Sequence, residues 1–197
     1  FRGPRRDLEQ PFVAFVGSSE TYGKFINEPF PALVEQQLGQ SCVNFGLLNA
    51  GVDAFVHDAF VINTAAYTQV DLAESEKDNA FLVNETGPAN LAEVCKRLDI
   101  PLVHFSTDYV FDGSKKSPWG EDDTTAPLGI YGASKLAGEQ AITQIHSKHL
   151  IFRTSWVFSE YGHNFVKTML HVGSMREKMK VVDDQIGKPT AAREIVR

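Results

Sequence analysis

The feature that most constrains the fold of this chain is a regular alternation of short apolar runs with longer helical patterns. Apolar runs of strand length that end in glycine or polar residues indicate buried strands. We predict strands over 11–17, 41–46, 58–65, 101–106 and 149–154, and helices over 30–38, 74–82, 84–98, 131–145 and 164–178. Strands that alternate with helices are typical of a largely parallel sheet covered on both faces. The sequence therefore predicts an α/β fold with a doubly wound parallel sheet.

Two further segments complete this prediction. Residues 112–129 are rich in glycine, proline, serine and aspartate, which predicts a loop. Residues 180–182 predict a last short strand.

Composition limits the partners that this chain can have. The 197 residues carry a formal net charge of −6, and a nucleic-acid groove would need a basic stripe. The only small basic cluster is Arg2, Arg5 and Arg6, which we interpret as a solvated terminus. No apolar run approaches the ~18 residues of a membrane span. We expect a cytoplasmic protein with neither a nucleic acid nor a membrane as partner.

Cysteines and acidic residues give no sign of a metal site. Cys42 and Cys95 are far apart and lack metal-ligand spacing, so we interpret them as small core residues in a reducing compartment. Glu121, Asp122 and Asp123 are adjacent acids in a loop, a pattern typical of a solvated turn. We assign no metal.

Small residues close the predicted strand 58–65. The segment Asn63-Thr64-Ala65-Ala66-Tyr67 follows its apolar part. Open α/β sheets bind ligands at the carboxyl ends of their strands, and small side chains there let a flat cofactor approach the backbone. Small residues also close strands for packing reasons, so this segment alone decides nothing.

A hydroxyl residue ends the next strand, in Ser106-Thr107-Asp108. The hydroxyl of Thr107 in that place can donate a hydrogen bond to a substrate carbonyl as negative charge develops on its oxygen. The alternative is that Thr107 caps a turn, which is the preferred interpretation of an isolated Ser-Thr-Asp.

Tyrosine and lysine are four residues apart in Tyr131-Gly132-Ala133-Ser134-Lys135. On a helix these positions face the same side. A nearby ammonium favours the phenolate, so we expect Lys135 to lower the tyrosine pKa and make the phenol a usable proton donor. An isolated Tyr-x-x-x-Lys is usually a solvated helix face.

The combination is more specific than its parts. A hydroxyl strand end, a loop, and then Tyr-x-x-x-Lys starting 24 residues after Thr107 resembles the active-site layout of extended short-chain dehydrogenases. Within that group, residues 57–197 resemble the dTDP-4-dehydrorhamnose reductase family. The matching stretches, in family order, are NTAAYTQVDLAES, HFSTDYVFDG, PLGIYGASKLAGE, LIFRTSWVF, NFVKTML and VVDDQIGKPT.

This resemblance implies a Rossmann-like fold and a reductase. Hydride would pass from NADPH or NADH to C4 of a keto sugar, converting dTDP-4-dehydro-L-rhamnose to dTDP-L-rhamnose for cell-surface polysaccharide. Tyr131 matches the proton donor, Lys135 the residue that holds the nicotinamide ribose and tunes the tyrosine, and Thr107 the hydroxyl that orients the carbonyl. The partner implied is a dTDP-sugar; the oligomeric state stays open, with a homodimer among the alternatives.

The resemblance also assigns residues around this trio. Asp108 and Trp156 match residues that contact the sugar nucleotide, and the segment Ala65, Ala66 and Tyr67 matches one that lies against the cofactor. Simple packing is the alternative for Tyr67 and Trp156. We interpret Asn84 as a structural residue that hydrogen-bonds backbone, and His104 as a satisfied interior residue and not a base.

The first 56 residues depart from the family. A reductase of this kind should begin with a strand leading into Gly-x-x-Gly-x-x-Gly, whose amides reach the cofactor pyrophosphate. Here the spacing from Gly17 to Gly23 is G-x-x-x-x-x-G, and Glu20 would repel phosphates. Residues 1–56 resemble a different, uncharacterised bacterial domain, which we interpret as an atypical N-terminal βαβ segment joined near Val56.

Two alternatives to an active reductase follow from this departure. The first is a catalytically impaired remnant that keeps the fold and cannot hold its cofactor. The second is a hydrolase with Ser18 or Ser19 as nucleophile, since the opening segment loosely resembles serine esterases. At the other end, the family resemblance implies a substrate domain that this chain contains only in truncated form.

Overall fold

A computed structural model describes residues 12–16, 35, 42–45 and 58–195 of the chain. The predicted nucleophiles Ser18 and Ser19, the Gly17–Gly23 spacing and most of the predicted helix 30–38 lie outside these residues. Glu35, within that predicted helix, is helical.

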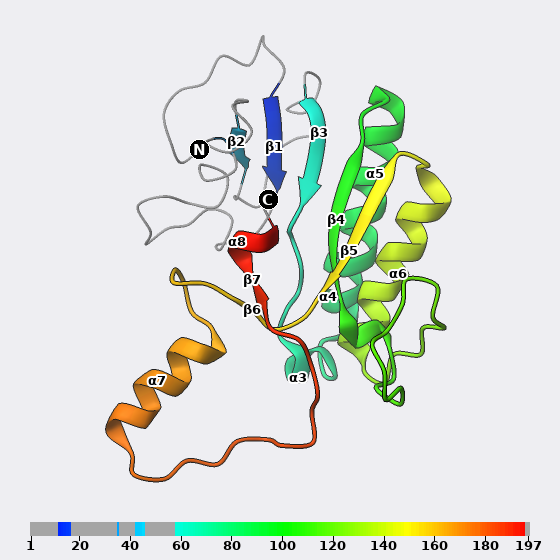
Figure 1. The fold of residues 1–197 in the computed structure, drawn as a ribbon. Helices are drawn as coiled ribbons and strands as arrows, with labels where there is room; N and C mark the ends of the chain where they lie inside the picture. The colour runs from blue at the N-terminus through cyan, green and yellow to red at the C-terminus, as the bar shows by residue number, and fades with distance from the viewer. Residues whose placement is uncertain (1–11, 17–34, 36–41, 46–57, 196–197) are drawn as a thin grey trace.

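Five parallel strands form the main sheet, in the order β2-β1-β3-β4-β5 (Figure 1). They are β1 (Phe12–Val16), β2 (Cys42–Phe45), β3 (Asp58–Asn63), β4 (Leu102–Thr107) and β5 (His149–Thr154). Apolar runs predicted all five, with ends that differ by at most two residues. Parallel neighbours require a crossover between them, which confirms the α/β fold.

The sheet order reverses beside β1, and this reversal locates the candidate site. β2 pairs with one edge of β1 and β3 with the other, so successive crossovers run in opposite directions. In such Rossmann-like sheets, ligands bind outside the carboxyl ends of the strands at the reversal. Asn63 closes β3 at that end, and Thr107 closes β4 beside Thr154 of β5.

The chain from β3 to β4 forms a broken helical segment. It consists of α3 (Val70–Ala73), α4 (Lys77–Phe81), a π-helical turn η2 (Leu82–Thr86) and α5 (Gly87–Leu98). The helix predicted over 74–82 begins later in the structure, because residues 74–76 lie outside any helix. The Ser75 hydroxyl donates to the Leu72 carbonyl at 3.0 Å, and side-chain bonds of this kind compete with helical backbone pairing.

Helix α6 (Ile130–Ile145) packs closely on this segment and on the turn after β4. A Cβ at Gly138 would lie 2.0 Å from the Asn84 carbonyl oxygen, and one at Gly132 would lie 2.2 Å from the Tyr109 carbonyl oxygen. Glycine at these two positions therefore lets α6 approach both backbones. Glu74 accepts from the Ile130 amide at 2.8 Å and so satisfies a free N–H at the start of α6.

The buried core lies between the sheet and the helices α5 and α6, which cover one face of β4 and β5 (Figure 1). Its fully or almost fully buried members are Val61, Ala92, Cys95, Leu102 and Ile142. Cys95 is 1% exposed, so its predicted place as a small core residue is confirmed.

Beyond β5 the chain forms a second, smaller region. A two-stranded parallel sheet pairs β6 (Val157–Phe158) with β7 (Thr190–Ala191), which is followed by α8 (Ala192–Ile195). The strand predicted over 180–182 is wrong: Thr190–Ala191 takes the place beside β6, and Val181 and Val182 are more than half exposed.

The helix predicted over 164–178 is shorter in the structure and forms α7 (Phe165–Met175). The Asn164 side chain caps it by accepting from the Lys167 amide, and Arg176 leaves the helix with ψ 135°. α7 stands apart from the main sheet (Figure 1). Among the described helices, none combines the length and apolar character needed to cross a membrane.

Candidate active site

Thr107 is held at the carboxyl end of β4 by its own turn. Its Oγ1 accepts from the Tyr109 amide at 3.2 Å and donates to Asp108 Oδ1 at 3.2 Å. The side chain thus caps the short 3-10 helix η3 (Asp108–Val110). The turn-capping role weighed against a catalytic one is therefore present, and it fixes the hydroxyl at the edge where a ligand would bind.

Tyr131 meets this hydroxyl from the first turn of α6. Its ring packs edge-on against Tyr109, with centroids 5.5 Å apart, and its phenol lies near enough to the Thr107 hydroxyl for that group to act on its pKa. Burial raises the pKa of Tyr131, and the Thr107 hydroxyl opposes this only in part. The expectation that Lys135 lowers this pKa is wrong for the structure, because the lysine amine is engaged elsewhere.

Lys135 directs its amine into the interior. The residue is 1% exposed, its Nζ donates to the Phe105 carbonyl at 2.7 Å, and it lies 3.2 Å from His104 Nε2. Burial lowers the pKa of Lys135 to about 8, opposed by the charge of Glu139. Tyr131 and Lys135 thus begin on one side of α6, and the partners of the lysine amine are His104 and the Phe105 carbonyl.

His104 connects Lys135 to the end of β3. It is fully buried, and its Nδ1 lies 2.9 Å from Asn63 Nδ2. Burial, assisted by the Lys135 charge, holds the pKa of His104 well below its usual value. The interpretation of His104 as a satisfied interior residue is confirmed, although its partners include a predicted catalytic side chain.

The segment after β3 is tied to α6 through Asn84. The Asn84 amide accepts from the Tyr67 N–H at 2.8 Å, donates to the Tyr67 carbonyl at 3.1 Å and donates to the Ser134 hydroxyl at 3.0 Å. Ala65 donates to Asn63 Oδ1 at 3.0 Å. The backbone bonds predicted for Asn84 are confirmed, and they bring the candidate cofactor segment to the helix that carries Tyr131 and Lys135.

Replacing Asn84 with alanine is expected to lower the free energy of unfolding by about 2–4 kcal/mol, because it removes the side-chain partner of both Tyr67 backbone groups and one of the two bonds of the Ser134 hydroxyl, which still donates to the Tyr131 carbonyl. Urea unfolding followed by circular dichroism measures this loss. Asn79→Ala is the matched control: its exposed amide makes one long bond, to Glu76 at 3.4 Å, and it should change stability by less than about 0.5 kcal/mol. Equal losses of unfolding free energy in the two variants would contradict a stabilising role for the Asn84 hydrogen bonds.

Asp108 and Trp156, the predicted sugar-nucleotide contacts, lie in different surroundings. Asp108 adjoins the trio; burial raises its pKa, and its bond from Thr107 opposes the rise. Trp156 follows β5 with a positive φ of 47° and packs closely over Gly187, while Thr190 donates to its carbonyl at 3.3 Å. A positive φ at a large side chain is costly and clusters at functional sites.

The sequence did not single out Ser106 by itself or connect Asn63 with His104. Within the described residues, the Ser106 hydroxyl is the one buried side-chain polar atom without a hydrogen-bond partner. Asn63 and His104 are 41 residues apart, so no local motif links them. A polar residue at the end of an apolar run was the only signal available for Asn63.

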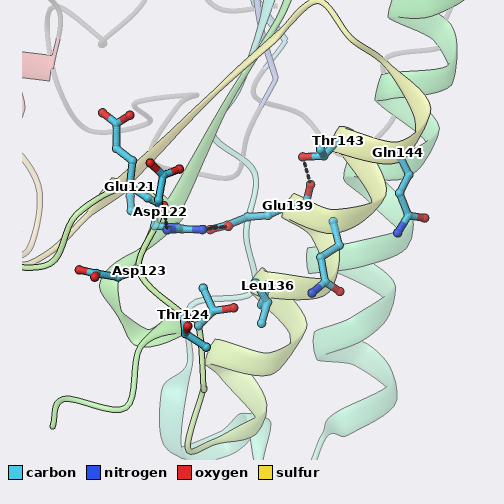
Figure 2. A pocket seen from close by; sticks show the side chains of 11 residues that line it. Glu121, Asp122, Asp123, Thr124, Leu136, Glu139, Thr143 and Gln144 are labelled. Atoms are coloured by element: carbon cyan, nitrogen blue, oxygen red, sulfur yellow. Dashed lines mark hydrogen bonds and ion pairs between the residues drawn. The ribbon is translucent and has the colours of Figure 1, made fainter. Parts of the chain in front are cut away.

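A separate hollow of about 430 Å³ lies along α6, away from the trio (Figure 2). It is bounded by the acidic loop 121–123 and by Glu139, which holds Arg153 through bonds of 2.7–3.2 Å. Glu139 is 4% exposed and fully engaged with Arg153. Asp123 pairs with Lys115. Since neither Thr107, Tyr131 nor Lys135 lines this hollow, it is not the candidate active site.

Two families match the sequence. Residues 42–197 match the RmlD substrate binding domain, and residues 1–74 match a domain of unknown function (DUF6473). The second match agrees with the expected resemblance of the first 56 residues to an uncharacterised domain.

Two curated relatives carry the same name. A dTDP-4-dehydrorhamnose reductase from Sinorhizobium fredii is 47% identical over 156 residues, which cover 77% of this chain and 53% of the relative. The reductase of the same name from Escherichia coli K12 is 49% identical over 132 residues, covering 67% and 44%. The chain therefore spans about half the length of these curated relatives.

Solved structures show the same likeness. A dTDP-4-dehydrorhamnose reductase from Bacillus anthracis, in complex with NADP, aligns with a TM-score of 0.80 at 35% identity, covering 95% of this chain and 68% of that one. A reductase of that name from Clostridium acetobutylicum aligns with a TM-score of 0.81 at 33% identity, covering 94% and 67%.

Proposed function

The chain belongs to the RmlD substrate binding domain family, and on this basis we propose that it is a reductase that converts dTDP-4-dehydro-L-rhamnose to dTDP-L-rhamnose with NADPH or NADH. The single observation that carries the proposal is that Tyr131 packs on Tyr109, in the turn that Thr107 caps at the carboxyl end of β4, which brings the phenol to the Thr107 hydroxyl. The names of the curated relatives and of the aligned structures support the choice of substrate.

The residues around the trio fit a nicotinamide cofactor. The Ser106 hydroxyl is buried without a partner in the described part of the chain, a state that costs about 1–3 kcal/mol and that a polar ligand would relieve. We propose that Ala65, Ala66 and Tyr67 hold the cofactor together with Tyr131 and Lys135. When bound, the reduced nicotinamide supplies the hydride.

The protein side chains would supply position and a proton. Thr107 donates to the sugar carbonyl oxygen, and Tyr131 protonates that oxygen as the hydride reaches C4, so the carbonyl becomes an alcohol. Since burial raises its pKa, Tyr131 stays protonated at neutral pH and has a proton to give. Asp108 and Trp156 would contact the sugar nucleotide.

The organisation of the chain is part of the proposal. We propose a reductase core with the start of a sugar-nucleotide-binding region over residues 57–197 and an atypical βαβ segment over residues 1–56. The substrate and the reduced cofactor are small soluble metabolites of the cytoplasm, which makes this the proposed compartment. A homodimer is testable by light scattering.

The purified chain, mixed with dTDP-4-dehydro-L-rhamnose and NADPH, should consume cofactor absorbance and yield a sugar nucleotide two hydrogens heavier by mass spectrometry. Omitting the substrate is the control for slow cofactor oxidation. Saturable NADPH fluorescence without turnover would instead indicate a chain that binds cofactor and lacks a working substrate region. No binding and no turnover would favour the impaired remnant, which the Gly17–Gly23 spacing motivates.

A further inference from the structure

We propose that Asn63 and His104 are positioning residues that hold Lys135 as a neutral amine, bound to His104 and to the Phe105 carbonyl, in the ligand-free protein. The inference rests on the proposed function only for the identity of the ligand that releases the lysine. Its basis is the direction of donation along a buried chain of hydrogen bonds from β3 through β4 to α6.

The first bond fixes the Asn63 amide. The Ala65 N–H can only donate, and it lies 3.0 Å from Asn63 Oδ1. This assigns the oxygen to that side and leaves Nδ2, a donor without acceptor capacity, facing His104 Nδ1 at 2.9 Å. A flipped amide would set two donors against each other on the Ala65 side. Asn63 is 1% exposed, so water does not rescue such a clash.

The second bond fixes the histidine tautomer. Because Asn63 Nδ2 donates, His104 Nδ1 must accept, and a neutral ring then carries its proton on Nε2. An imidazolium is excluded by the same contact and by full burial, which holds the pKa of His104 well below its usual value.

The third contact decides the state of Lys135. His104 Nε2–H lies 3.2 Å from Lys135 Nζ, and an ammonium has three donors and no lone pair to accept it. A neutral amine can accept from His104 and still donate to the Phe105 carbonyl at 2.7 Å. Every donor in this series of hydrogen bonds, from Asn63 through His104 to Lys135, has an acceptor only when Lys135 is neutral.

Burial makes this neutral state accessible at mildly alkaline pH. Burial lowers the pKa of Lys135 to about 8, while Glu139, on the same helix, opposes the shift. Arg153 of β5 donates to both carboxylate oxygens of Glu139 through Nε and Nη2, and its positive charge weakens the effect of Glu139 on the Lys135 pKa. From β4, His104 faces the amine as a neutral ring.

The consequence is a lysine with two positions. Protonation of Lys135 sets donor against donor at His104, so the charged side chain must leave that place. The proposed role of Lys135, holding the nicotinamide ribose beside Tyr131, uses the charged form. Cofactor binding is therefore expected to draw up to one proton from solution above about pH 8.

Nitrogen-15 NMR of the ligand-free protein tests the tautomer directly. The His104 signals, assigned by their loss in His104→Gln, should show a protonated Nε2 and an unprotonated Nδ1. A ring protonated on Nδ1 would overturn the proposal. This measurement is made on the wild-type protein without cofactor, and the His104→Gln variant serves only to assign the signals. Its outcome is therefore independent of whether the protein has reductase activity.

Asn63→Asp reverses the chain by design. A carboxylate keeps the bond from Ala65 and accepts from His104 Nδ1–H, which leaves Nε2 as an acceptor for a charged lysine. The Lys135 pKa, followed by carbon-13 NMR at Cε, should rise so that proton affinity increases at least tenfold, and the tautomer should switch. A rise of the Lys135 pKa without the switch of the His104 tautomer would be an effect of the added charge alone, and it would overturn the proposal.

Calorimetry of NADPH binding in two buffers of different ionisation enthalpy tests the release step. Wild type at pH 8.5 should take up a large fraction of one proton, and Asn63→Asp at least threefold less. Binding with equal proton uptake in both proteins contradicts the proposal, whereas absence of NADPH binding counts against the proposed function and leaves the tautomer result to decide this inference.

Discussion

Tyr131→Phe is expected to lower kcat for reduction of the keto sugar by about 10²–10⁴-fold, the range for loss of a positioned general acid. The KM for NADPH should change little, because the ring remains to pack against Tyr109 and only the phenol oxygen is lost. Initial rates of NADPH consumption at neutral pH measure the effect.

A matched substitution separates this effect from a general one. Tyr161 is 40% exposed and lies in the loop before α7, so Tyr161→Phe removes a phenol oxygen without touching the trio. It should retain wild-type activity. If Tyr131→Phe kept more than a fifth of the wild-type kcat, Tyr131 would not be the proton donor.

Lys135→Met is expected to abolish most activity. Its free energy of unfolding, relative to that of the wild type, should nevertheless be higher at neutral pH than at high pH. The fall of the Lys135 pKa from 10.5 to about 8 corresponds to about 3 kcal/mol by which the folded protein disfavours the charged form of this side chain. Methionine removes that cost while losing the bond to Phe105, worth about 1 kcal/mol.

The lowered pKa of Lys135 sets the direction in which stability changes with pH. Between about pH 8 and 10.5 the unfolded chain holds a proton on Lys135 that the folded protein lacks, so wild-type stability rises with pH in this window. The advantage of Lys135→Met should shrink by about 2 kcal/mol between pH 7 and 9.5. Urea unfolding at the two pH values measures it.

Lys148→Met is the control, since Lys148 is half exposed and pairs with Asp99 at the surface. Its effect on stability should be small, with no comparable rise or fall across the same pH range. A Lys135→Met effect that is flat between pH 7 and 9.5 would mean that Lys135 is not buried as a depressed-pKa amine.

Local sequence patterns predicted most of the secondary structure. Each strand of the main sheet is an apolar run bounded by breakers, and α6 follows directly from the amphipathic stretch after a glycine-rich loop. The errors fell where a side chain or a distant partner decides. Ser75 interrupts a helical pattern through its bond to Leu72, and residues 180–182 lack a strand beside them.

The candidate site was predictable for a different reason. Thr107 and Tyr131 are in short motifs whose spacing places them at one sheet edge, and the family resemblance gives each a role. Asn84 was predictable as a backbone-bonding residue, although its bond to Ser134, 50 residues away, was not.

The sequence by itself determined the α/β class and the positions of the five strands, and it proposed Thr107, Tyr131 and Lys135 as the trio, because hydrophobic periodicity and motif spacing are properties of neighbouring residues. Only the tertiary structure decided where the Lys135 amine points. Its partners, His104 and the Phe105 carbonyl, lie 31 and 30 residues earlier in the chain, and Asn63 lies further still. The direction of donation along such a chain exists only once β3, β4 and α6 are packed together, since burial removes the water that would otherwise satisfy each group.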